Sequence, residues 1–270
     1  VTKKENNLNN MGNQNRKLFF LIALPRSGNT LFASIMNQNA SVACTGNSVT
    51  LEIMKNLYLI KTTDTFLNFP DHKSLDNILD NVFNLYYKDW PQRIIIDRGP
   101  ALVSGNPGNF ELMQKHFKHE FKCIVLLRDL MDVLASYMKW YTENPDSFVN
   151  KLGKTDEEKL SALMDTNGAI VKEIKSIKNS YNYPNMCHFI KYDDMIANSK
   201  KVFQELYKFL DEPYYPHQFQ DLKQININDI GYNDTVLGKN MHTIRSTVKK
   251  ETNNYVVPDS IRERYGHIKI

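Results

Sequence analysis

The apolar residues of the chain follow two patterns that alternate as far as residue 210. The first is a short unbroken run closed by Pro, Gly or a charged residue, which predicts buried strands at residues 18–24, 93–97, 121–127 and 186–192. The second repeats every three or four positions and predicts helices at residues 30–37, 49–60, 74–87, 110–117, 129–141, 155–181, 199–210 and 258–265. Strands that alternate with helices predict an α/β fold, in which helices flank a central parallel sheet of about four to five strands.

Local signals mark the ends of two predicted helices. Ser74 is expected to be the N-cap of the third helix. Thr155 and Glu158 have the spacing of a capping box, which predicts the start of the helix at residues 155–181. Gly168 is expected to weaken the middle of that helix.

Three segments lack either pattern. Residues 1–16 are rich in Asn and Lys and have few apolar positions, so we expect a disordered leader. Residues 41–48 are expected to form a polar connection, and residues 211–257 to form loops and short helices over the sheet. A length of 270 residues allows one large domain with a substantial core, and we expect residues 17–270 to form it.

Composition narrows the classes of partner. Hydrophobic residues make up 41% of the chain and charged residues 24%, which is typical of a soluble globular protein. The net charge of +4 does not indicate nucleic-acid binding, for which a clustered basic face is expected. No apolar stretch approaches the roughly 20 residues that span a membrane. The three cysteines are far apart, without metal-ligand spacing, and favour a reducing, cytoplasmic compartment: Cys44, Cys123 and Cys187.

The first predicted strand ends in a polar turn, residues 25–30, that reads Pro-Arg-Ser-Gly-Asn-Thr. A helix that begins just after Gly28 points its free N–H groups at this turn, where the helix dipole also favours an anion. Arg26 adds a full positive charge. The turn therefore predicts a binding site for a phosphate or phosphosulfate group.

The turn departs from the nucleotide-binding loop of kinases and ATPases. The Walker A pattern is G-x-x-x-x-G-K-[ST]. In the same frame Ala23 replaces the first Gly and Asn29 replaces the Lys. Phosphoryl transfer needs that Lys and a metal ion to neutralise several phosphate charges. The departures therefore count against an NTPase.

A second charged turn follows the third predicted strand. Arg128 ends this strand, and Ser136 lies eight positions later in the next helix. A guanidinium can bind a phosphate through two hydrogen bonds, and a Ser hydroxyl two helical turns away can donate another. Because ligands bind at the carboxyl ends of parallel strands, both turns are expected to lie at one edge of the sheet.

The two motifs resemble those of sulfotransferases that use 3′-phosphoadenosine 5′-phosphosulfate (PAPS) and release 3′-phosphoadenosine 5′-phosphate (PAP). The resemblance implies the P-loop-NTPase-like sulfotransferase fold and a reaction without a metal. It implies that Arg128 and Ser136 bind the 3′-phosphate. It also implies that the first turn binds the 5′-phosphosulfate through Arg26, Ser27, Gly28, Asn29 and Thr30. The Pro-Arg-Ser-Gly sequence of the turn is closer to the bacterial and tyrosylprotein types of the family than to the cytosolic aryl type.

Two further segments extend the resemblance. The fourth strand continues as Tyr-Asp-Asp-Met, similar to the family's Y-E-D-L segment, which implies that Tyr192 lies near the adenine. A Tyr that only closes a core strand is an equal alternative. Residues 238–249 are similar to the late loop that closes over the nucleotide, which implies Arg245 as a contact of the 3′-phosphate, while a solvated basic loop is the alternative for each basic residue taken singly. The other basic candidates there are Lys239, Lys249 and Lys250.

The family resemblance also bears on the transfer step. Sulfuryl transfer is expected to be in line with a loose transition state, so positioning and electrostatics dominate. Arg26 is expected to stabilise the leaving phosphate. Family members have a Lys or His after the second strand. Arg98 stands near that turn here, and by analogy it holds the sulfuryl oxygens but cannot act as a base.

The base that takes the acceptor's proton has three candidates. The tyrosylprotein type has a Glu shortly after the first helix, and Glu52 is the preferred match, although counting alone leads to Asn47. Asp97 is second, and we expect the neighbouring Arg98 to lower its pKa and pair with it. His242, in the late loop, is third.

The preferred function is a PAPS-dependent sulfotransferase that acts on a small-molecule, saccharide or peptide acceptor. A degenerate P-loop small-molecule kinase is one alternative. A nucleotide-binding module without catalysis is the other.

Overall fold

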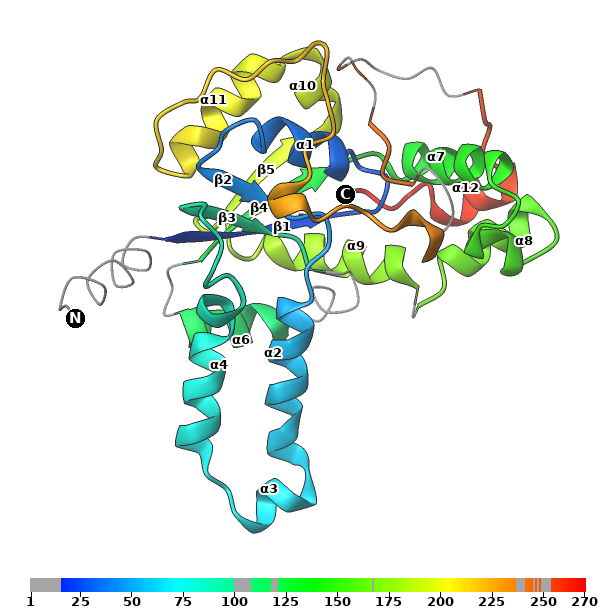
Figure 1. Cartoon of the computed structure of the whole chain (residues 1–270). Helices are drawn as coiled ribbons and strands as arrows, with labels where there is room; N and C mark the ends of the chain where they lie inside the picture. Colours follow the sequence, from blue (N-terminus) through cyan, green and yellow to red (C-terminus); the bar gives the residue numbers. More distant parts are fainter. Residues whose placement is uncertain are drawn as a thin grey trace.

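The structure of the protein is a computed structural model that describes residues 16–99, 108–117, 121–166, 168–236, 241–244, 246, 248 and 254–270. Its centre is a sheet of five parallel strands in the order β2-β3-β1-β4-β5 (Figure 1). The strands are β1 (Lys17–Ala23), β2 (Val42–Cys44), β3 (Ile94–Asp97), β4 (Lys122–Leu127) and β5 (Cys187–Lys191). The predicted α/β fold with a parallel sheet is confirmed. Since β1 is the middle strand, the turn that follows it lies at the middle of one sheet edge.

Alternate residues of β1 pack on opposite faces of the sheet. Phe20 and Ile22 belong to one hydrophobic core, together with Ile95 of β3. Phe19 and Leu21 belong to a second core on the other face. This two-sided burial explains why the strands read as unbroken apolar runs rather than as an alternating pattern.

Helices supply the rest of both cores (Figure 1). One face is covered by α1 (Asn29–Met36), α10 (Tyr192–Ala197) and α11 (Ser199–Phe209). The remaining helices supply side chains to the core on the other face: α2 (Thr50–Leu59), α3 (Asp64–Asn68), α4 (His72–Tyr86), α6 (Gly108–Phe117), α7 (Leu130–Glu143), α8 (Asp156–Leu163), α9 (Ala169–Ser180) and α12 (Asp259–Tyr265). Among these, α2 and α4 form the arms of a hairpin that projects from the body of the protein, with α3 near its tip.

Two predicted boundaries are wrong. Helix α4 begins at His72 because Asp71, rather than Ser74, is its N-cap, and the Asp71 carboxylate accepts a hydrogen bond from the Ser74 backbone N at 3.0 Å. Residues 41–48 are not a connection throughout, because they contain the edge strand β2. Three residues are too few to show a strand pattern in a sequence.

The single helix predicted at residues 155–181 is two helices, α8 and α9. Thr155 and Glu158 do form the predicted capping box at the start of α8. The chain leaves the helix after Leu163, and α9 starts behind Gly168. A Cβ at position 168 would lie 2.7 Å from the Leu163 carbonyl oxygen, so glycine permits this close approach.

The remaining expectations concern irregular segments. In its described part, the stretch 211–257 contains two 3-10 turns, Ile227–Asp229 and Asp234–Val236, and otherwise loops, as predicted. The predicted leader falls on residues 1–15, outside the described residues, and on Arg16. The Arg16 guanidinium donates hydrogen bonds to three backbone carbonyls, which belong to Tyr87, Trp90 and Gln92.

Candidate active site

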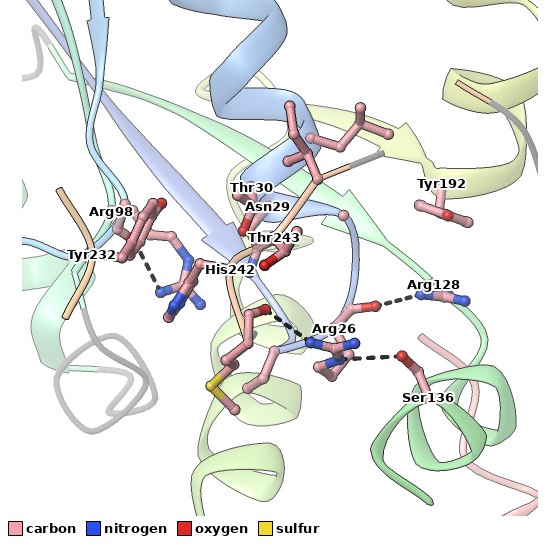
Figure 2. Close-up of a pocket in the computed structure, with 16 residues that line it drawn as sticks. Arg26, Asn29, Thr30, Arg98, Arg128, Ser136, Tyr192, Tyr232, His242 and Thr243 are labelled. Atoms are coloured by element: carbon pink, nitrogen blue, oxygen red, sulfur yellow. Dashed lines mark hydrogen bonds between the residues drawn. The ribbon is translucent and has the colours of Figure 1, made fainter. Parts of the chain in front are cut away.

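The carboxyl edge of the sheet carries a cavity of about 200 Å³ (Figure 2). The turn after β1, the ends of β3 and β4, the start of α10 and a late segment of the chain meet there. The cavity is lined by Pro25, Arg26, Gly28, Asn29, Thr30, Leu31, Gly46, Arg98, Arg128, Ser136, Tyr192, Tyr232, Met241, His242, Thr243 and Ile244. Most residues predicted to bind the ligand are therefore close together, although they lie far apart in the sequence.

The turn at residues 25–30 has an unusual backbone. Gly28 has φ = 87°, in the left-handed region that favours glycine, and its carbonyl accepts the Phe32 N–H at 2.8 Å as α1 begins. A Cβ at position 28 would also lie 2.9 Å from the Tyr192 ring. Glycine thus serves two purposes, since it makes the turn and lets Tyr192 pack against it. Arg26 also has a positive φ of 65°, so the turn is strained at a residue with a Cβ.

One end of the cavity is built around Arg128, which follows β4. Its guanidinium carbon lies 4.2 Å from the centre of the Tyr192 ring, and Nη1 donates a hydrogen bond to the Arg26 carbonyl oxygen. The Arg26 Nε donates to Ser136 Oγ at 3.2 Å, and its Nη1 donates to the Met241 carbonyl oxygen at 3.0 Å. The side chains at this end therefore form one connected network (Figure 2). We refer to Arg128, Ser136 and Tyr192 as the donor end.

The other end is built around Arg98, which follows β3. Its Nη1 donates to Asn47 Oδ1 at 2.6 Å and to the Gly46 carbonyl oxygen at 3.4 Å. Tyr232 and His242 stack nearby with ring centres 4.0 Å apart and an angle of 9° between the planes (Figure 2). Burial raises the pKa of Tyr232 to about 12, so its hydroxyl stays protonated at neutral pH. We refer to Arg98, Tyr232 and His242 as the acceptor end.

A carboxylate fixes the orientation of His242. The Asp234 side chain bonds to His242 Nδ1 and accepts the His242 backbone N–H at 3.1 Å. Because the carboxylate occupies Nδ1, the neutral ring carries its proton there, and Nε2 is left as an acceptor. Such an Asp–His pair has the arrangement of a general base.

Several polar atoms around the cavity are buried without a hydrogen-bond partner in the structure. They include two donors, the Nε atoms of Arg98 and Arg128, and the side-chain oxygens of Ser27 and Asn29. Buried polar groups are normally hydrogen-bonded, and leaving a donor unpaired costs about 1–3 kcal/mol. The two guanidinium groups at opposite ends of the cavity therefore fit a ligand with an anionic group at each end.

The expectation for Asp97 is wrong. Its side chain is fully buried and accepts hydrogen bonds from the Tyr87 hydroxyl and, at 2.7 Å, from Thr50 Oγ1. Burial raises the pKa of this carboxyl, whereas pairing with Arg98 was expected to lower it. Asp97 is the last residue of β3 and points to the same face as Ile95, toward the core under α2, whereas Arg98 follows the strand and lines the cavity.

The other predicted residues are placed as follows. Glu52 is exposed in the first turn of α2 and is not part of the cavity lining. Arg245, like Lys239, Lys249 and Lys250, lies outside the described residues. Of the three candidate bases, His242 is the one that lines the cavity.

Comparisons with known proteins agree with this architecture. The sequence profile of the sulfotransferase domain matches residues 16–256. The chain belongs to the sulfotransferase family. A search of curated proteins finds no match.

Two solved structures resemble this sulfotransferase. The sulfotransferase domain from the curacin biosynthetic pathway is 18% identical, with a TM-score of 0.55 over 95% of this chain and 92% of that one. The sulfotransferase domain of the Synechococcus PCC 7002 olefin synthase is 13% identical, with a TM-score of 0.53 over 96% and 90% of the two chains. Similarity at this identity supports the shared fold.

The part of the sulfotransferase that the structure describes has neither a helix suited to crossing a membrane nor a cluster of three metal-ligating His, Cys, Asp or Glu side chains.

Sequence reasoning missed Asp234 and Tyr232 in this sulfotransferase. Asp234 lies eight residues before its partner His242, in a stretch without periodicity. Tyr232 contacts Gly46, where a Cβ would lie 2.0 Å from its hydroxyl oxygen. The presence of Asp, His and Tyr within eleven residues of an irregular segment was the available signal, and it does not reveal which partners these residues find.

Proposed function

We propose that this sulfotransferase transfers a sulfuryl group from PAPS to an acceptor hydroxyl. The observation that carries the proposal is a single cavity whose donor end holds Arg128 and whose acceptor end holds Arg98, with the turn at residues 25–30 between them. An adenosine with phosphates at both ends suits these separated cationic groups. The donor supplies an activated sulfuryl group on its 5′-phosphate.

The donor end would hold the 3′-phosphoadenosine part. Arg128 has an unpaired buried Nε, and Ser136 lies beside it in the same network. Tyr192 is expected to lie along the adenine or ribose.

The α1 N-terminus, with Ser27, Asn29 and Thr30, is expected to bind the 5′-phosphosulfate because free N–H groups and the helix dipole favour an anion there. We keep Arg245 as a proposed contact of the 3′-phosphate.

The acceptor end would perform the transfer. A bond forms between the acceptor oxygen and sulfur while the bond from sulfur to the bridging oxygen breaks, and that oxygen leaves with the electron pair on PAP. His242 Nε2 takes the proton of the acceptor hydroxyl, and Asp234 holds the imidazole in the required tautomer. Arg98 stabilises the negative charge on the sulfuryl oxygens, and Arg26 that on the leaving phosphate. His242 therefore replaces Glu52 as our preferred base.

A thermal-shift experiment tests the ligand class. A ligand at 100 times its Kd stabilises a protein by ~2.7 kcal/mol. We expect PAP to stabilise the protein by about this amount and so to raise its Tm, and we expect little change in Tm with ATP and Mg²⁺. The reverse result would support the degenerate kinase and reject the sulfotransferase proposal.

Transfer of ³⁵S from labelled PAPS to a broad acceptor panel tests catalysis. Labelled product with at least one hydroxyl acceptor is expected. Binding of PAP without transfer to any acceptor would favour the nucleotide-binding module instead.

A further inference from the structure

A second cavity, of about 250 Å³, adjoins the acceptor end. The two cavities share the lining residues Thr30, Gly46 and Tyr232. The second cavity is otherwise formed by one side of α1, the connection after β2, the end of α4 and the residues that follow it, and the segment 224–233. A molecule in this space would have one end at the junction beside Arg98 and Tyr232, where the transfer is proposed.

Tyr232 forms the wall between the two cavities. Its hydroxyl lies against Gly46, and its ring is stacked on His242. Arg98 reaches the same boundary through its hydrogen bonds to Gly46 and Asn47. The proposed base and the proposed sulfuryl-binding cation thus both lie at the boundary between the two cavities.

The lining of the second cavity is uncharged. Its described residues include no Lys, Arg, His, Asp or Glu: they are Thr30, Ala33, Ser34, Asn37, Cys44, Thr45, Gly46, Asn47, Ser48, Tyr86, Tyr87, Trp90, Gln224, Ile225, Asn226, Ile227, Ile230, Gly231, Tyr232 and Asn233. Burial of an ionised group without a counter-charge is strongly unfavourable. The lining therefore selects against an acceptor that carries a charge inside this space.

Several polar side chains of the lining are already paired within the protein. Asn37 exchanges two hydrogen bonds with the Cys44 backbone, at 2.7 and 3.1 Å. Thr45 Oγ1 accepts the Arg98 N–H at 2.9 Å, and the Tyr87 hydroxyl donates to Asp97. Groups that are paired in this way offer little to a polar ligand. In the buried part of the cavity, recognition would depend on the aromatic and aliphatic side chains.

The exposed part of the lining carries no charge: it consists of Tyr86, Ile230 and Gly231 together with the amide side chains of Asn47, Gln224, Asn226 and Asn233. Among these residues, Ile230 is 61% exposed and Tyr86 is 42% exposed. Exposed apolar side chains at the mouth of a concave site are typical of ligand entry. A dry cavity of about 150 Å³ binds benzene, so about 250 Å³ has room for one substituted ring or a chain of similar bulk.

We propose that this second cavity binds the sulfuryl acceptor, and that the acceptor is an uncharged phenol or alcohol of about one ring in size. This inference rests on the proposed sulfotransferase function and narrows its substrate class. It disfavours acidic peptides and anionic saccharides as acceptors.

Three matched phenols test the inference on the PAP-bound protein. They are 4-propylphenol, its carboxylated counterpart 3-(4-hydroxyphenyl)propanoate, and the amine tyramine. We expect 4-propylphenol to bind at least tenfold more tightly than either charged analogue, as measured by calorimetric titration. The titration does not depend on turnover.

A variant at the rim tests the location. Ile230→Arg introduces a counter-charge at an exposed position, so it should shift the ratio of affinities about tenfold toward the carboxylated phenol. Val256→Arg is the matched control, because Val256 is 70% exposed and lies outside both cavity linings. The control should leave the ratio unchanged.

The outcomes separate the two proposals. Failure of PAP to stabilise the protein would overturn the proposed function itself. If PAP binds, the acceptor inference is overturned by any of three results: equal affinity for neutral and charged phenols, no binding of the three phenols at millimolar concentration, or an unchanged ratio in Ile230→Arg.

Discussion

The two ends of the active-site cavity differ in how the chain builds them. At the donor end, Arg128 and Ser136 belong to one strand–helix unit, β4 and α7, and lie eight residues apart. At the acceptor end, Arg98 follows β3, whereas Tyr232 and His242 come from an irregular segment more than 130 residues later. When one strand–helix unit carries a site, its residues are separated by a fixed number of positions, and this spacing can be recognised in the sequence. When remote loops assemble a site, its residues have no characteristic spacing, so only the three-dimensional structure identifies them.

The most damaging substitution should be at the acceptor end. His242→Ala removes the proposed base, and loss of a general base typically reduces kcat 10²–10⁴-fold. PAP affinity should stay within about threefold, because the donor end is untouched. Steady-state kinetics with a phenol acceptor, together with PAP titration, measure both quantities. Added imidazole should restore part of the activity.

His267→Ala is the matched control, since His267 is exposed near the chain terminus and lies outside the cavity lining. It should retain full kcat. A His242→Ala enzyme with unchanged kcat would remove His242 from the mechanism and make the acceptor end a binding surface only.

The second prediction concerns the donor end. Arg128→Ala should weaken PAP binding about 10–100-fold, because a charged hydrogen bond to phosphate contributes about 1.5–3 kcal/mol. The affinity for adenosine 5′-phosphate, which lacks the 3′-phosphate, should fall only a few-fold. Calorimetric titration of both nucleotides measures the difference. Equal losses for the two would mean that Arg128 supports the turn through the Arg26 carbonyl rather than binding the 3′-phosphate.

The same contrast explains what the sequence could predict. Unbroken apolar runs identified four of the five strands, because burial on both faces gives them a local signature. The turn at residues 25–30 and the Arg128 motif were local as well. The proposed base was not local, because the resemblance to the tyrosylprotein type favoured Glu52, which is exposed, and counting alone led to Asn47. Asp97 also misled, because it ends β3 and is buried in the core, whereas the neighbouring Arg98 follows the strand and lines the cavity.

The third prediction tests whether Asp234 positions the base. Asp234→Asn should lower kcat about tenfold, since an amide no longer fixes the tautomer of His242 as the carboxylate does. The KM for the acceptor and the affinity for PAP should change little. Asp234→Glu should recover part of the loss. A purely structural Asp234 would instead lower Tm and raise the KM together with the fall in kcat, and the Glu variant would not help.

The smallest expected effect tests the wall between the two cavities. Gly46→Ala would place a Cβ 2.0 Å from the Tyr232 hydroxyl, so Tyr232 must move. The acceptor kcat/KM should fall about threefold while PAP binding is retained, since the donor end lies on the other side of the turn. In a Tyr232→Ala background the same substitution should have no effect, because the clashing ring is gone. Additive losses in this double-mutant cycle would mean that Gly46 acts on Arg98 through its carbonyl rather than on Tyr232. In that case the connection after β2 would position Arg98, and the sheet rather than the segment that carries Tyr232 would determine the geometry of the acceptor end.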